Sequence, residues 1–264
     1  MSTNRLLQLR GSDLVMTWLP AILSAVPIVL LALYIFYFGV EVPYWDEWEL
    51  VPLLDTIESP GERLQFQDLW GQHNEHRIIF PKLTLLFLAR VSDWSIMLEM
   101  YAGLILLVLT MLGVWFIYRT RANRSLWGLV PAAFVMFNLG QWENILWGWQ
   151  VTIWLQMAGV VWAIYFLSRR SLRGTLAAVL AAVVASYSFN SGLLIWPVGL
   201  LMLALLRAGK RSFGIWSAAG IATFVLYYSD YAFPRNGYSI TTTLVRPLKT
   251  VSYTHLTLPT KRIV

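Results

Sequence analysis

The order of apolar and polar positions divides the chain into long apolar runs separated by short charged segments. A helix needs about 20 apolar residues to cross the hydrocarbon core of a bilayer, and seven runs are predicted to do so. Some of them are shorter, and we expect flanking Trp and Tyr residues to complete them at the interfaces. The predicted spans are residues 18–40, 96–118, 126–139, 146–167, 176–189, 193–206 and 213–228. The pattern therefore predicts an all-α, polytopic transmembrane helical bundle.

An eighth apolar run, residues 78–89, does not fit this description. It has 12 residues, contains Pro81 and Lys82, and is followed by Arg90. This is too short to cross a bilayer, so we interpret it as a helix on the outer membrane surface, within the first long loop. The alternative, in which this run is itself a span, reverses the side of every later loop.

The charges along the chain favour the first arrangement. Nine basic residues lie at three alternate junctions between the later spans: Arg119, Arg121, Arg124, Arg169, Arg170, Arg173, Arg207, Lys210 and Arg211. The loop 41–77, by contrast, contains nine of the fourteen acidic residues. Because cytoplasmic junctions are rich in Lys and Arg, we expect a cytoplasmic N-terminus and an external first long loop. The predicted location is the inner (plasma) membrane of a bacterium, with the first apolar run retained as an anchor.

Composition agrees with a membrane location and excludes several functions. Of the 264 residues, 58% are hydrophobic and 13% are charged, against roughly a quarter charged in a soluble domain. The net charge of +6 is explained by the basic junctions, so the expected partner is the lipid bilayer and not a nucleic acid. The chain has no Cys, which excludes disulfides, thiolate catalysis and Cys-ligated metals.

The last fourteen residues differ from the rest of the chain. Residues 251–260 read as one translated frame of a common transposase-type sequencing adapter, and the composition becomes polar there. We therefore expect 251–264 to be an adapter-derived, non-native tail, and residues 1–250 to be the N-terminal part of one larger transmembrane domain. The alternative is an ordinary polar tail.

Candidate chemistry gathers in the first long loop. Asp46 and Glu47 follow the first span directly and are flanked by Tyr and Trp. Carboxylates in this position suit a general base, or ligands for a divalent cation such as Mg²⁺ or Mn²⁺. Solvated loop acids between interfacial Trp residues are the simpler interpretation.

Two further polar groups accompany this pair. His73, Glu75, His76 and Arg77 occupy five positions before the surface helix, where they suit proton transfer and phosphate binding or form a polar helix start. The His spacing is not that of a zinc-protease helix. Glu143 lies in the outer turn 140–144 and is, with Asp46, the expected metal ligand.

One acid lies within a predicted span. Burying a charge in lipid is costly, so an acid within a span is a candidate for function, and Glu99, near the outer end of the span 96–118, is the one candidate. The alternative is that its carboxyl group reaches the interface by snorkelling.

This order of features resembles the type C (GT-C) membrane glycosyltransferases, which include the protein O-mannosyltransferases and the aminoarabinose transferases. The resemblance covers residues 15–230 and lies in the acidic pair Asp46-Glu47, the His76-Arg77 segment before the surface helix, and the later outer acid Glu143. The single Pro81 replaces the family's Pro-Pro pair, and Glu143 stands where Asp is usual. The chain thus resembles a divergent branch of the superfamily.

The resemblance implies transfer of a sugar from a polyprenyl-phosphate donor to an acceptor at the outer membrane face. Asp46 would be the general base, and Glu47 and Glu143 would position a divalent cation or the acceptor. His76 and Arg77 would face the donor phosphate, with His73 and Glu75 beside them. A transporter or flippase and a non-catalytic membrane assembly protein remain as alternatives. Sugar, acceptor and metal are left open.

Overall fold

The computed structural model describes residues 11–121 and 125–232, and the predicted tail 251–264 lies outside these ranges. Within them the chain forms helices and no named strand, which confirms the all-α prediction. The longer helices are α1 (Gly11–Phe38), α4 (Ile79–Ser92), α5 (Ile96–Arg121), α8 (Val151–Ser168), α9 (Leu172–Ser186), α10 (Ile195–Leu205) and α11 (Lys210–Tyr228). The shorter elements are η2 (Trp45–Leu50), α2 (Val51–Glu58), α3 (Phe66–Trp70), η3 (Leu126–Gly128), α6 (Leu129–Met136), η4 (Leu139–Gln141), α7 (Trp142–Ile145), η5 (Gly148–Gln150) and η6 (Asn190–Leu194).

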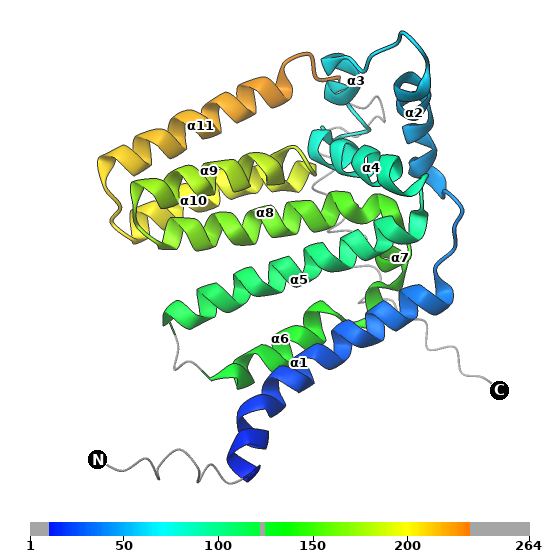
Figure 1. The fold of residues 1–264 in the computed structure, drawn as a ribbon. Helices are drawn as coiled ribbons and strands as arrows, with labels where there is room; N and C mark the ends of the chain where they lie inside the picture. The colour runs from blue at the N-terminus through cyan, green and yellow to red at the C-terminus, as the bar shows by residue number, and fades with distance from the viewer. Residues whose placement is uncertain (1–10, 122–124, 233–264) are drawn as a thin grey trace, which may run out of the picture. The chain divides into compact units, whose positions relative to one another are not determined.

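The long helices pack side by side with similar directions (Figure 1). α5 lies between α1 and α8, α8 contacts α9, and α9 and α10 contact α11. Gly159 of α8 allows a close approach to α9, because a Cβ there would stand 2.7 Å from the carbonyl oxygen of Ala181 in α9. Small residues at a helix interface let backbones approach in this way.

Among the described residues, three helices are long and apolar enough to cross a membrane: Trp18–Phe38, Ile96–Arg119 and Gly148–Ser168. This is fewer than the seven predicted spans. For α9 the difference arises from helix length, because its 15 residues extend only about 22 Å at 1.5 Å per residue, short of a hydrocarbon core of about 30 Å. The 8 residues of α6 reach still less far. The 19 residues of α11 are long enough, but this helix begins with Lys210 and Arg211 and is less apolar.

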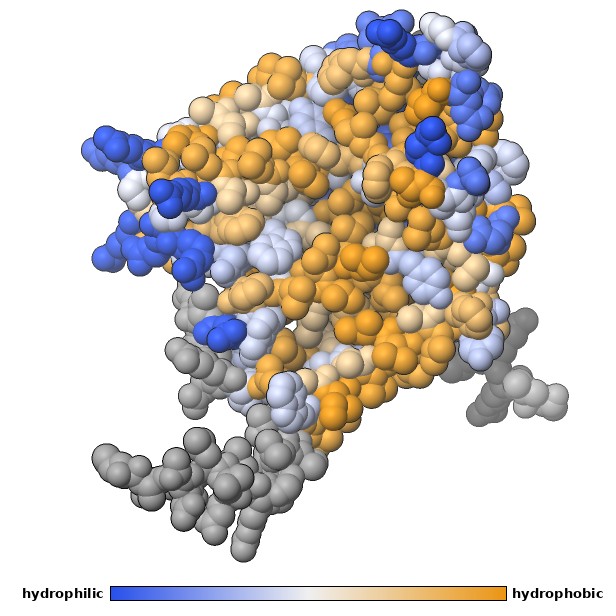
Figure 2. Space-filling view, viewed as in Figure 1, coloured by the Kyte–Doolittle hydropathy of each residue, from blue (hydrophilic) through white to orange (hydrophobic). Residues whose placement is uncertain are grey.

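The surface is apolar along the helices and polar at their ends (Figure 2). Trp18, Ile22, Leu30 and Phe36 of α1 are exposed, although large apolar side chains in water are unfavourable. This distribution is typical of a membrane protein.

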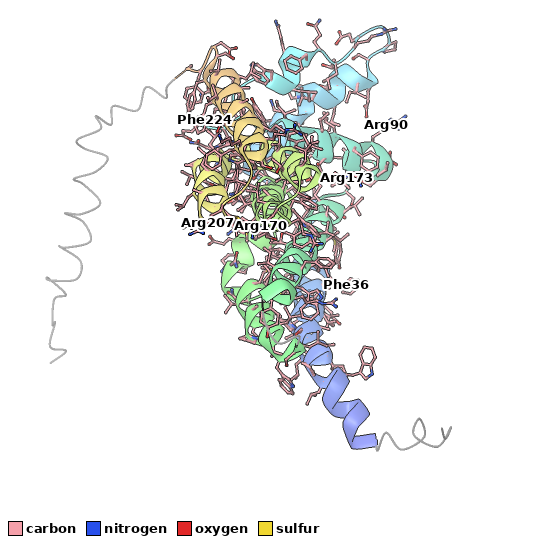
Figure 3. All side chains as sticks on the ribbon, turned by 90° about the vertical axis from the view of Figure 1, so that its left-hand side faces the viewer. Phe36, Arg90, Arg170, Arg173, Arg207 and Phe224 are labelled. Atoms are coloured by element: carbon pink, nitrogen blue, oxygen red, sulfur yellow. The ribbon has the colours of Figure 1, made fainter. Side chains whose placement is uncertain are left out.

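The two ends of the helices differ in charge. Arg170, Arg173 and Arg207 lie together at one end (Figure 3). Arg170 is in the turn between α8 and α9, Arg173 is in the first turn of α9, and Arg207 is in the turn between α10 and α11. The short elements η2, α2, α3 and α7 gather at the opposite end (Figure 1). The acidic loop and the basic turns are therefore separated by the length of the bundle.

Candidate functional site

The first loop is fastened to the bundle at its start. Glu41 accepts hydrogen bonds from the backbone N–H groups of Ile96 and Met97, at 2.8 and 3.3 Å, and from the Ser95 hydroxyl at 2.7 Å. These N–H groups belong to the first turn of α5 and have no partner within the helix, so a carboxylate there satisfies them and complements the helix dipole. The chain then turns into η2, which carries Asp46, Glu47 and Glu49.

Glu47 joins two segments that are a hundred residues apart in the sequence. Its side chain is fully buried and accepts hydrogen bonds from the backbone N–H groups of Tyr44, at 2.6 Å, and Trp149, at 3.0 Å. Burial raises the pKa of this carboxyl group, while the backbone hydrogen bonds from Tyr44, Trp149 and Gly148 oppose the increase. Both carboxylate oxygens are thus engaged, and Glu47 holds η2 against η5. This geometry assigns it a positioning role rather than that of a free base.

Asp46 points to the other side of η2, where it meets His73 and Glu49. His73 Nδ1 lies 2.6 Å from Glu49 Oε2, and its Nε2 lies 3.5 Å from Asp46 Oδ2. The His73 side chain is 5% exposed and packs edge-on against the Trp149 ring, whereas Asp46 is 27% exposed and can be reached from water. The structure thus brings Asp46 and His73 together.

The short contact with Glu49 indicates which His73 nitrogen carries the proton. A neutral imidazole that donates from Nδ1 to Glu49 presents the Nε2 lone pair on the side of Asp46, where the Asn74 amide nitrogen is 3.2 Å away. A carboxylate that orients a histidine in this way is common behind metal-binding and catalytic imidazoles. The arrangement can accept a proton at Asp46 or hold a cation between Asp46 and His73.

Asp46, Glu49 and His73 together offer a potential cation site. One ligand atom from each residue lies within 4.8 Å of the others. Two carboxylates with one imidazole suit a cation such as Mn²⁺ or Zn²⁺ better than Mg²⁺, which prefers oxygen ligands alone. The sequence prediction omitted Glu49. Glu49 follows Asp46 by three residues, and this spacing could have identified it, because residues i and i+3 lie on the same side of a 3₁₀-helix.

The second pair of predicted residues points elsewhere. His76 pairs with His73 through the backbone only, and its ring stacks on Phe189 at 4.0 Å between centroids. His76 Nδ1 accepts a hydrogen bond from the backbone N–H of Asn190 at 3.2 Å. These contacts direct the His76 ring toward η6 and away from the Asp46 cluster. Burial lowers the pKa of His76.

Arg77 is buried, and its guanidinium group is directed at the end of α11. It donates to the carbonyl oxygens of Tyr227 (2.6 Å), Trp70 (2.9 Å) and Ser229 (2.5 Å), and to the Asp230 carboxylate at 2.8 Å. The guanidinium carbon also lies 4.6 Å from the centre of the Trp70 ring. The observed contacts of Arg77 are therefore structural. Glu75 is exposed, and its carbonyl oxygen accepts from the Tyr227 and Tyr231 hydroxyl groups.

Glu143 is exposed on α7, at the same end of the bundle as η2. Trp147, four residues later, stacks on Trp45 with 6.0 Å between ring centroids and donates to the Tyr44 carbonyl oxygen at 3.1 Å. Glu143 does not belong to the group of possible metal ligands formed by Asp46, Glu49 and His73. The exposed Trp45 ring forms an aromatic surface beside Asp46.

Glu99, near the start of its predicted span, is fully buried in the first turn of α5. Its carboxyl group therefore packs inside the protein. The side chain faces Gly148, where a Cβ would stand 2.5 Å from Glu99 Oε2 and 3.0 Å from Glu47 Oε1. Glycine at position 148 therefore allows the two carboxyl groups to approach the same point.

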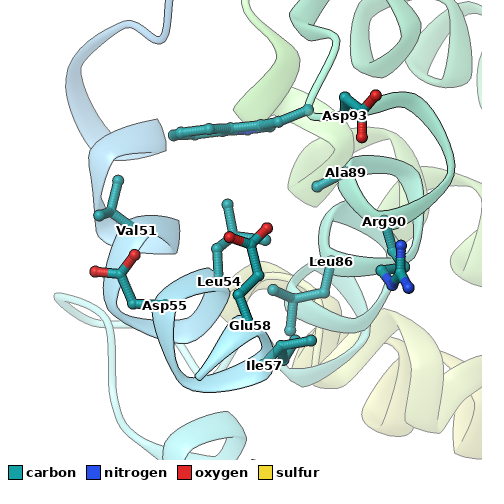
Figure 4. Close-up of a pocket in the computed structure, with 10 residues that line it drawn as sticks. Val51, Leu54, Asp55, Ile57, Glu58, Leu86, Ala89, Arg90 and Asp93 are labelled. Atoms are coloured by element: carbon teal, nitrogen blue, oxygen red, sulfur yellow. The ribbon is translucent and has the colours of Figure 1, made fainter. Parts of the chain in front are cut away.

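Two cavities flank this region. A groove of about 280 Å³ lies between α2 and α4, and Figure 4 shows Asp55 and Glu58 on one wall and Arg90 on the other. A second cavity of about 320 Å³ lies between the ends of α1 and α5, where Glu47 is the one carboxylate among apolar lining residues. The Asp46 cluster lines neither cavity, so both are separate from the candidate site.

Comparison with protein-family models, with curated proteins and with solved structures finds no match to this chain.

Proposed function

We propose that this chain is a membrane glycosyltransferase that moves a sugar from a polyprenyl-phosphate donor to an acceptor at the outer face of the membrane. The observation that carries the proposal is the cluster of a water-accessible Asp46, a buried His73 and Glu49. This cluster lies at the end of an apolar bundle, where a lipid-bound donor and a water-borne acceptor can meet.

Asp46 acts as the general base. The acceptor hydroxyl gives its proton to the Asp46 carboxylate while the hydroxyl oxygen forms a bond to the anomeric carbon of the sugar. The bond between that carbon and the phosphate oxygen breaks, and its electron pair leaves with the phosphate. His73 Nε2 faces Asp46 at 3.5 Å, and Glu49 fixes the imidazole orientation. The exposed Trp45 ring offers the flat apolar surface that a sugar ring packs against.

A leaving phosphate needs positive charge nearby. Arg77 supplies little, because its guanidinium donates to backbone carbonyl oxygens and to Asp230. A divalent cation held by Asp46, Glu49 and His73 would supply that charge when bound.

The proposal includes the complete topology. Helices α6, α9, α10 and α11 also cross the membrane, completed by their flanking 3₁₀ turns and aromatic residues, which gives seven spans. α4 lies on the outer surface, and the N-terminus is in the cytoplasm of a bacterium. The separation of the Arg-rich turns from the acidic loop supports this orientation.

The test replaces Asp46 with Asn in the membrane-embedded protein. Transfer of labelled sugar from polyprenyl phosphate to membrane acceptors is expected to fall by about 10²–10⁴-fold, the usual contribution of a general base. Asp55→Asn, in the same loop but on the groove wall, is the matched control and keeps the wild-type rate. A wild-type rate in Asp46→Asn removes the base assignment.

Glu99 favours a second candidate, a proton-coupled transporter or flippase. Ionisable residues buried within spanning helices often mark proton relays. A transporter moves its substrate across sealed vesicles in proportion to a pH gradient and forms no glycosidic product. A sugar transferase needs no gradient, so the two functions separate in one vesicle assay.

A further inference from the structure

The Glu99 carboxyl group is isolated within the part of the chain that the structure describes. The residue is fully buried, and neither of its side-chain oxygens has a hydrogen-bond partner. The Trp94 indole nitrogen is also buried there without a partner. An ionised carboxylate under these conditions is very unfavourable, because nothing replaces the water that solvated it.

A second carboxylate increases that cost. The Glu47 side chain, which comes from η2, lies beside Gly148 as Glu99 does. A third acid, Glu41, accepts a hydrogen bond from Ile96 in the first turn of α5. Glu47 has donors that stabilise its negative charge, namely the backbone N–H groups of Tyr44 and Trp149. Glu99 has only the Trp94 indole N–H close by, and that group is outside hydrogen-bond geometry. Two carboxyl groups this close do not both ionise easily, and the proton goes to the one with fewer donors.

We propose that Glu99 is a buried proton-binding site that keeps its proton at neutral pH. A proton fits better than a metal ion, because hard cations take six or more oxygen ligands. The Glu47 oxygens are already engaged, and the neighbouring cavity is lined mainly by apolar residues such as Met100 and Leu146.

The site connects a spanning helix to the Asp46 cluster. Glu99 lies in α5 and abuts Gly148, and the next residue, Trp149, packs against the His73 ring. Loss of the Glu99 proton places two negative charges on either side of Gly148 and separates η2 from η5. The proton thus maintains the geometry around Asp46, whether or not the chain transfers sugars.

Infrared spectroscopy of the purified chain in lipid nanodiscs tests this inference. At pH 7 we expect the carbonyl stretch of a protonated carboxyl group in the wild type and its loss in Glu99→Gln. The exposed Glu58→Gln is the matched control and retains the band. Absence of the band from the folded wild type, or its persistence in Glu99→Gln, overturns the proposal.

A second measurement does not depend on the folding of Glu99→Gln. In Glu47→Gln the neighbouring charge is removed, and the band should disappear at a lower pH than in the wild type, by about one unit or more. An unchanged titration contradicts the carboxyl pair. Appearance of the band only after treatment with EDTA shows that a metal ion occupies the site, and this too overturns the proposal.

Discussion

Replacement of Arg77 with Met removes a buried guanidinium group that joins the first loop to the end of α11. Arg77 is 1% exposed, and its donors satisfy three carbonyl oxygens and one carboxylate. Methionine fills much of the same volume but offers no donor. The change therefore tests the hydrogen bonds of Arg77 with little alteration of packing.

The magnitude follows from the partners left behind. A hydrogen bond to a charged group contributes about 1.5–3 kcal/mol, but several bonds to one group are not additive. The ion pair with Asp230 adds little, because that side chain is 69% exposed and screened by solvent. Removal of one member of a buried polar network costs about 3–5 kcal/mol in total, and we expect Arg77→Met to lower the free energy of unfolding by that amount.

The measurement is equilibrium unfolding of the purified chain in mixed detergent micelles, followed by circular dichroism. Asp230→Asn is the matched control and is expected to change the free energy of unfolding by less than about 1 kcal/mol. If Arg77→Met is also within about 1 kcal/mol of the wild type, the structural role of Arg77 is refuted. Its guanidinium group would then be available for a donor phosphate, as the family resemblance implies.

Three further predictions concern the same end of the bundle. Gly148→Ala places a Cβ against the buried carboxyl groups of Glu99 and Glu47 and should destabilise the fold by about 1–3 kcal/mol in the same unfolding measurement. Gly214→Ala places its Cβ in open space beside α11 and should not destabilise the fold. Burial lowers the pKa of His76 below its unfolded value of 6.5, so stability should decrease as the pH falls through 6.5, and thermal unfolding of His76→Gln between pH 7 and 5 should lack this decrease. Mn²⁺ at a hundred times its dissociation constant should stabilise the wild type by about 2.7 kcal/mol and should not stabilise His73→Ala. Glu143→Gln should keep the full stabilisation by Mn²⁺. Loss of this stabilisation in Glu143→Gln would favour Asp46 and Glu143 as the metal ligands.

Local pattern was sufficient to predict a helical membrane protein. A run of apolar residues is a property of adjacent positions, so the helices α1, α5 and α8 could be expected from hydropathy alone. The same holds for α4, whose predicted run 78–89 lies almost entirely within Ile79–Ser92. The grouping of acids in one loop and of arginines at alternate junctions is likewise visible in the order of residues.

The roles of individual side chains depended on partners far away in the sequence. Glu47 is engaged by Trp149, and Arg77 by residues of the α11 end, more than a hundred positions later in each case. No local pattern contains these contacts, because they arise only when helices pack. Glu99 shows the same limit: its position in an apolar run was evident, but its burial against Gly148 was decided by how α5 and η5 meet. Hydropathy is read along the chain, whereas the solvation of a charged group is determined by everything that surrounds it in space.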